Sequence, residues 1–151
     1  MNALRKQDPV KFEAFLKQRY EFVYEMANRW QRDGISALLT PFWPHCACKA
    51  SNAGDMGMML DYSVMWNITG FPAGILPITR VRENEQTFND SHGDFWTRLI
   101  HNDCEDSSGM PICLQIVGYA FEDEKVLGIM KKLEKQIKYE IEMPPIITYN
   151  K

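Results

Sequence analysis

Apolar residues recur at helical spacing near both ends of the chain. Asp8 can cap a helix and Pro9 suits its first position, while Gly34 can end it, so the first stripe predicts a helix between them. Its members, at three- and four-residue steps, are Phe12, Phe15, Leu16, Tyr20, Val23, Met26, Ala27 and Trp30. The acidic run Glu122–Glu124 suits a helix N-terminus and precedes a second helix with an apolar stripe of Val126, Met130, Leu133 and Ile137.

Between these helices, short apolar runs predict three buried strands, at 35–40, 73–78 and 112–117. A central helix over 58–69 should end at Gly70, because the following Phe71-Pro72 pair cannot continue it. Inside the polar stretch 83–108, a short amphipathic helix is predicted by the spacing of Phe95, Trp96, Leu99 and Ile100. Helices and strands thus alternate, which predicts an α/β/α three-layer sandwich with a mixed or parallel sheet.

The organisation is that of one domain. We find no internal repeat and no low-complexity linker, so we expect residues 1–151 to form a single unit with an N-terminal extension (1–8) and a tail (140–151). A capped helix soon after Met1 favours a genuine chain start.

Composition limits the partners and the compartment. The net charge of −3, from 17 basic and 20 acidic residues, argues against nucleic acid or an anionic membrane as partner. No apolar run approaches the roughly 18 residues of a membrane span, and the polar N-terminus resembles neither a signal nor a transit peptide. Four cysteines without dense spacing favour a reducing environment. These features predict an intracellular protein and leave its compartment open.

Three strands that are apolar on both faces would leave two bare sheet edges. Such edges promote aggregation, so we expect other protein chains or further sequence to complete the sheet. Gln115 lies in the middle of the third apolar run, where a buried amide needs a hydrogen-bond partner. We expect Gln115 to tie the sheet to the missing part.

Three blocks in order carry a family resemblance: LLTP (38–41), YSVMWNITGFPAGILP (62–77) and SGMPICLQIVG (108–118). Together with GDFW (93–96), they resemble the amidase signature hydrolases, and within them the fatty acid amide hydrolases. The resemblance covers residues 20–137. It implies a large α/β/α sandwich with a mixed sheet, of which this chain would hold only the C-terminal part.

The catalytic residues that the resemblance implies are missing from this sequence. The family uses a serine nucleophile, a second serine and a lysine base in a Gly/Ser-rich region, and no such region occurs here. The pair Ser107-Ser108 precedes Gly-Met-Pro and is more simply a turn. We therefore predict no catalytic residue in this chain and no amide hydrolysis by the chain alone.

Part of a substrate-binding wall is implied instead. By this resemblance, Leu60, Val64 and Trp96 match positions that line an acyl-chain channel in the fatty acid amide hydrolases. The resemblance also implies a fatty acyl group as the candidate ligand. Leu60 and Val64 lie one helical turn apart and so share a face. The alternative, that all three are ordinary core residues, stays equally open.

His45, Cys46 and Cys48 are candidate ligands of a soft metal, with His92, His101 or Cys104 as distant partners. The Cys-x-Cys step lacks the spacing of common zinc turns, so we predict no metal and no cofactor. Two functions remain. The chain is a non-catalytic, amidase-like structural subunit of a larger assembly, or it is one piece of an active amidase whose catalytic residues lie upstream or on a companion chain.

Overall fold

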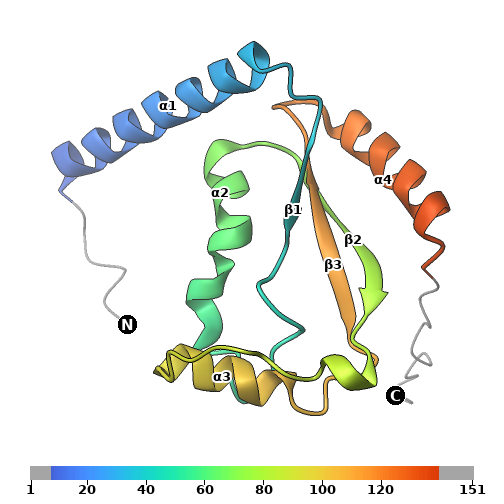
Figure 1. Ribbon diagram of the computed structural model, residues 1–151. Coiled ribbons are helices and arrows are strands. Elements are labelled where there is room, and N and C mark those ends of the chain that lie inside the picture. Colours follow the sequence, from blue (N-terminus) through green and yellow to red (C-terminus); the bar gives the residue numbers. More distant parts are fainter. Residues whose placement is uncertain (1–7, 140–151) are drawn as a thin grey trace, which may run out of the picture.

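The computed structural model describes residues 8–139, which fold into four α-helices around a three-stranded sheet (Figure 1). Most of the predicted N-terminal extension and the whole predicted tail lie outside the described residues. The helices are α1 (Pro9–Arg32), α2 (Asp61–Thr69), α3 (Phe95–Cys104) and α4 (Asp123–Ile137), with 3-10 turns η1 (Met56–Leu60) and η2 (Glu83–Glu85). The strands are β1 (Leu38–Pro41), β2 (Ala73–Arg80) and β3 (Pro111–Val117).

Local sequence signals account for the helix ends. The Asp8 side chain accepts a hydrogen bond from the Val10 N–H, and the Asp94 side chain accepts one from the Thr97 N–H at the start of α3. Gly70 closes α2 with φ 73°, the left-handed conformation expected of a glycine there. The 58–69 helix prediction is confirmed for α2, although the segment before Asp61 is a tighter 3-10 turn.

The strand order is β1-β3-β2, and both pairs are antiparallel. A mixed or parallel sheet was expected, so the pairing within this chain differs from that prediction. Parallel strands need a crossover, whereas the excursion between β2 and β3 returns as a wide hairpin, closed by the Gly109 N–H bonding the Val81 carbonyl. Pro77 is tolerated within β2 because β2 is an edge strand and its register with β3 shifts just after Pro77.

The sheet lies between two helical layers (Figure 1), as the three-layer prediction requires. On one face, α4 packs on Leu76 and Ile116 through its predicted stripe, with Val126 buried. On the other face, the end of α1 and α2 pack on Val117 through Trp30 and Trp66, together with Phe71 from the turn after α2. The rings of Trp30 and Phe71 meet edge to face, with centroids 5.4 Å apart.

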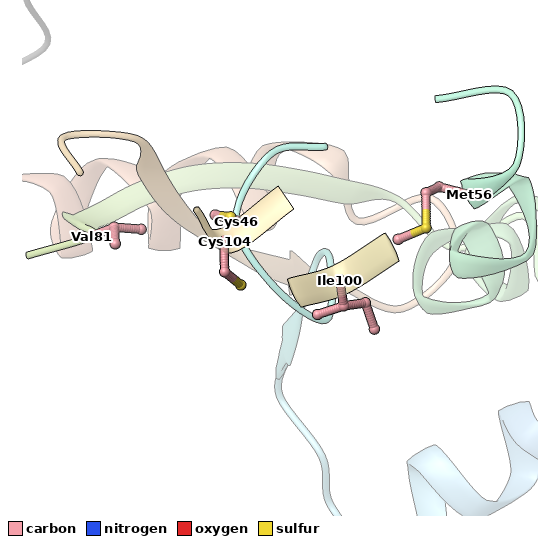
Figure 2. Close-up of a cluster of buried hydrophobic side chains, with 5 residues drawn as sticks. All are labelled: Cys46, Met56, Val81, Ile100 and Cys104. Atoms are coloured by element: carbon pink, nitrogen blue, oxygen red, sulfur yellow. The ribbon is translucent and has the colours of Figure 1, made fainter. Parts of the chain in front are cut away.

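A third cluster closes the end of the molecule where α3 lies. Figure 2 shows its buried members, which come from the loop after β1, η1, the residue after β2 and α3: Cys46, Met56, Val81, Ile100 and Cys104. The predicted amphipathic helix is thereby confirmed, because Ile100 of α3 is buried and Leu99 packs against the same cluster.

Both outer strands of the sheet, β1 and β2, are edge strands among the described residues. Within residues 8–139, β1 and β2 each bond to β3 and to no further strand. Leu39 on β1 and Ile75 on β2 are 55% and 43% exposed. No helix in the described part of the chain is long and apolar enough to cross a membrane.

Candidate functional site

The segment η1–α2 carries two of the three predicted channel residues. Leu60, the last residue of η1, and Val64 of α2 are 49% and 37% exposed. They form one outward stripe with Ile68, which is 45% exposed. The opposite side of α2 faces the protein, where Trp66 is buried. Since Leu60 and Val64 face outward, they are not core residues of this chain.

Trp96, the third predicted residue, lies in the first turn of α3 and is half-buried. It packs against the cluster of Figure 2, which includes Met56 of η1, and its ring lies 5.2 Å from that of Phe95. Trp96 therefore belongs to the layer around the buried cluster, whereas Leu60 and Val64 lie on the outward side of η1 and α2. A role for these three residues as an acyl-channel wall stays a prediction.

A buried polar cluster surrounds Asp103 of α3. Its Oδ1 accepts hydrogen bonds from the Lys49 N–H at 2.9 Å and Asn52 Nδ2 at 2.7 Å. Its Oδ2 lies 3.1 Å from Nε2 of His45, and both of these side chains are almost wholly buried. Cys46 donates its thiol hydrogen to the Asp103 carbonyl oxygen at 3.3 Å. These bonds tie the loop after β1 to α3 by satisfying a carboxylate that would otherwise be costly to bury.

The sequence reasoning missed Asp103, although one signal was available. On α3 the apolar residues Trp96 and Ile100 recur at helical spacing, and the same face continues to Asp103. A carboxylate on the buried stripe of an amphipathic helix needs partners, and these come from a loop more than fifty residues earlier. Their identity could not be read from local sequence.

The residues weighed as metal ligands are used otherwise. His45 and Cys46 bond to Asp103, and His92 lies on the surface next to Asp90. Within residues 8–139, no group of three or more His, Cys, Asp or Glu side chains is placed to hold a metal ion.

An apolar cavity of about 340 Å³ lies between the loop after β1 and the start of β3. The residues that line it are Phe42, Trp43, His45, Ala47, Cys48, Pro111, Ile112 and Cys113. Burial raises the pKa of the Cys113 thiol above its ordinary value. The neutral thiol is thereby favoured, so Cys113 is poorly suited to act as a nucleophile.

Cys104 is still less suited to nucleophilic chemistry. Burial, assisted by the adjacent Cys46 thiol and by Asp103, raises the pKa of Cys104 to about 11. All four cysteines of the chain are free thiols in the structure. Cys104 therefore serves as an apolar packing residue of the Figure 2 cluster, beside Cys46, whose thiol bonds the Asp103 carbonyl oxygen.

Ser107, which the sequence assigns to a turn, and Ser63 both make local contacts. Ser107 is buried, and its Oγ donates to the Cys104 carbonyl oxygen at 2.6 Å, closing the turn after α3 as predicted. Ser63 Oγ donates to the Leu60 carbonyl oxygen at 3.1 Å. These hydroxyls bond to carbonyl oxygens three residues earlier in the chain, which is a local structural role.

Gln115 was expected to bond to a missing part of the domain, but its amide has partners within this chain. It is 2% exposed, and its Nε2 lies 3.4 Å from both Thr40 Oγ1 of β1 and the Tyr62 carbonyl oxygen of α2. The expectation was wrong for this amide nitrogen, because β3 is the central strand and both strands beside it belong to this chain.

Known proteins resemble this chain in sequence. No protein-family model matches it. Its curated relatives are fatty-acid amide hydrolases and amidases. Fatty-acid amide hydrolase 1 of Sus scrofa is 23% identical over 116 residues, covering 74% of this chain. Fatty acid amide hydrolase 1 of Caenorhabditis elegans is 28% identical over 113 residues (73% of this chain), and an amidase of Gibberella moniliformis is 27% identical over 121 residues (79%).

The fold agrees with this relationship. A solved structure of fatty acid amide hydrolase matches 88% of this chain with a TM-score of 0.74 and 16% sequence identity, and the match covers 24% of that chain. The fold is thus that of one part of an amidase-like sandwich. The chain spans only about 20% of the length of each of the three curated relatives.

Proposed function

We propose that this chain is a non-catalytic, amidase-like piece that serves as a structural subunit, with its sheet completed by another protein in a larger assembly. The observation that carries the proposal is the size of the match: about 20% of each relative, with the two outer strands of the sheet pairing on one side only within residues 8–139. Unpaired strand edges require a cover or a partner.

The sequence supports the non-catalytic part of the proposal. The Gly/Ser-rich region with the Ser-Ser-Lys residues of the amidase signature family does not occur in these 151 residues. Ser63 and Ser107 are engaged with carbonyl oxygens. An intracellular, reducing location is part of the proposal and is supported by the four free thiols.

A second function is favoured by the outward stripe of α2. In an active amidase acting on fatty acyl amides, Leu60 and Val64 would contribute to the wall of an acyl channel, together with Trp96. Upstream sequence or a companion chain would supply the serine, which attacks the amide carbonyl carbon and expels the amine. Water would then hydrolyse the acyl-serine intermediate, and this chain would bind and position the acyl group.

Isolation of the tagged chain with its native companions, followed by treatment with a fluorophosphonate probe, separates the two functions. The structural role predicts that neither the chain nor its companions are labelled and that oleamide is not hydrolysed. Labelling of an associated amidase-like polypeptide, with oleamide turnover, would support the active enzyme. A Val64→Trp variant would then lower the turnover of long acyl amides more than that of short ones, whereas Tyr24→Trp, on the exposed outer side of α1, would not.

A further inference from the structure

The apolar stripe of α1 is covered at one end only. Trp30 is 3% exposed, and Met26 packs against the same cluster, whereas Phe12 and Phe15 in the N-terminal half are 52% and 60% exposed. All four residues lie on one face of the helix. In Figure 1, α1 extends past the end of α2 toward its own N-terminus. The stripe therefore continues onto a part of α1 that nothing among the described residues covers.

The helix α2 also has uncovered apolar residues, on the side that faces away from the sheet. One side packs on the sheet through Trp66, while Val64 and Ile68 on the other side are 37% and 45% exposed. A helix with apolar residues on opposite sides is typical of the interior of a protein, where both sides are covered. By contrast, the clustered apolar residues of α4 all face the sheet.

These two uncovered faces meet where α1 crosses the end of α2. Arg19 of α1 donates a hydrogen bond from Nε to the carbonyl oxygen of Ile68 at 2.7 Å. From this contact, the stripe of α1 runs toward Phe12 and the outward stripe of α2 runs toward Val64, and the two helices diverge (Figure 1). We call the surface formed by Phe12, Phe15, Val64 and Ile68 the α1–α2 face.

We propose that the α1–α2 face binds an apolar helix of the amidase-like polypeptide that completes the sandwich. This inference rests on the proposed function. A helix fits because two diverging helical stripes offer grooves into which the side-chain ridges of a third helix can pack. The length of the relatives, about five times that of the matched segment, points to the rest of an amidase-like polypeptide as its source.

A surface hollow between α2 and β1 also supports the rest of an amidase-like polypeptide as the source of this helix. A hollow of about 330 Å³ joins the outer edge of the sheet to α2, lined by Thr40, Pro41, Asp61, Tyr62, Met65 and Trp66. A polypeptide that pairs with the open edge of β1 has a path onto α2 through this hollow. One body can cover the strand edge and the α1–α2 face together.

Site-specific photocrosslinking in the native host tests the proposal. The photoreactive amino acid benzoylphenylalanine replaces Phe12 or Ile68 in the tagged full chain, and crosslinked peptides are identified by mass spectrometry. Tyr24 is the matched control: it is 71% exposed and lies nine residues, or two and a half turns, after Phe15, on the opposite side of α1. We expect crosslinks from Phe12 and Ile68 to one amidase-like sequence outside residues 1–151, and none from Tyr24.

A variant pair measures the strength of the contact. Phe12→Glu with Phe15→Glu should lower the yield of that amidase-like polypeptide with the tagged chain about tenfold or more, whereas Tyr24→Glu should leave it unchanged. Because Phe12 and Phe15 are exposed, their replacement should not unfold the chain, which circular dichroism would verify.

A further crosslinking position distinguishes failure of this inference from failure of the proposed function. Leu39 lies on the open edge of β1 and reports on completion of the sheet. Crosslinks from Leu39 to the amidase-like polypeptide, but none from Phe12 or Ile68, would overturn the α1–α2 face and keep the structural role. Crosslinks from Phe12 to a second copy of this chain or to lipid would also overturn it, and the absence of any crosslink, at Leu39 included, would overturn both.

Discussion

Arg19 and Ile68, 49 residues apart in the sequence, are joined by a 2.7 Å hydrogen bond from the guanidinium Nε to the backbone carbonyl oxygen. This carbonyl is in the last turn of α2, where helix geometry leaves the oxygen without a partner in the helix. A cation at this end also interacts favourably with the helix dipole. The bond therefore fixes where α1 crosses α2, which in turn decides which part of the α1 stripe is covered.

Replacing Arg19 tests this anchor. Arg19→Met keeps an apolar stem and removes the donor, so it should lower the free energy of unfolding by about 1 kcal/mol. It should also speed amide hydrogen exchange in the middle of α1. Arg29→Met is the control, because Arg29 pairs with Glu25 inside α1 and such surface pairs contribute only about 0.3–0.5 kcal/mol. Equal effects of the two variants in urea unfolding would contradict the anchoring role.

Removing the acceptor at Asp103 should be costly. Asp103→Ala removes the acceptor of the Lys49 N–H, one of the two acceptors of Asn52 Nδ2, which also bonds Asn102 Oδ1, and the partner of His45 Nε2. We expect a loss of about 3 kcal/mol or more, measured by urea unfolding. Asp55 is exposed and lies in the same loop as Lys49 and Asn52. Asp55→Ala should therefore change stability by no more than about 0.5 kcal/mol. A near-neutral Asp103→Ala would show that the cluster does not hold the loop.

Two glycines at the α4 layer should respond oppositely to alanine. A Cβ at Gly118 would lie 2.5 Å from Val126 Cγ2, a buried and branched side chain, so Gly118→Ala should destabilise the fold by about 1–3 kcal/mol. Gly128 lies inside α4 with open space around it, and Gly128→Ala should stabilise by about 0.5–1 kcal/mol. Thermal unfolding of the two variants beside the parent chain measures both. The same sign for both changes would mean that α4 does not pack on this strand end as described.

The raised pKa of Cys104 predicts a pH dependence of stability. The fold favours the neutral thiol, since the pKa rises from an ordinary value of 9.0 to about 11. This contribution to stability is therefore fully present below about pH 9 and is lost as the pH rises toward 11. Urea unfolding at intervals across this pH range should show the decline in the free energy of unfolding. Cys104→Ser should remove the part of that decline that is due to the Cys104 thiol. An identical slope in the two proteins would refute the assignment to Cys104.

Thiol modification measures the same property directly. Iodoacetamide reacts with the thiolate, so Cys104 in the folded chain should be modified at pH 8 far more slowly than in the urea-unfolded chain. Mass spectrometry of the labelled peptides reports each cysteine separately. Modification of Cys104 at equal rates in both states would contradict its burial.

The sequence by itself determined the elements whose signals are local. Helix periodicity and caps depend on residues three or four positions apart, which is why the helix start at Asp8 and the helix end at Gly70 agree with the structure. The ordered blocks also sufficed to indicate the amidase relationship, and the lack of a Gly/Ser-rich region is a property of the sequence alone.

Only the tertiary structure decided which residues meet. The antiparallel order β1-β3-β2, the acceptors around Asp103 and the partners of Gln115 depend on segments that lie about thirty or more residues apart. The stripe of α1 reads as uniformly apolar, yet Trp30 is buried and Phe15 is exposed. Periodicity identifies the apolar side of a helix, but how much of that side is covered depends on where the other elements pack, and this is set by long-range contacts.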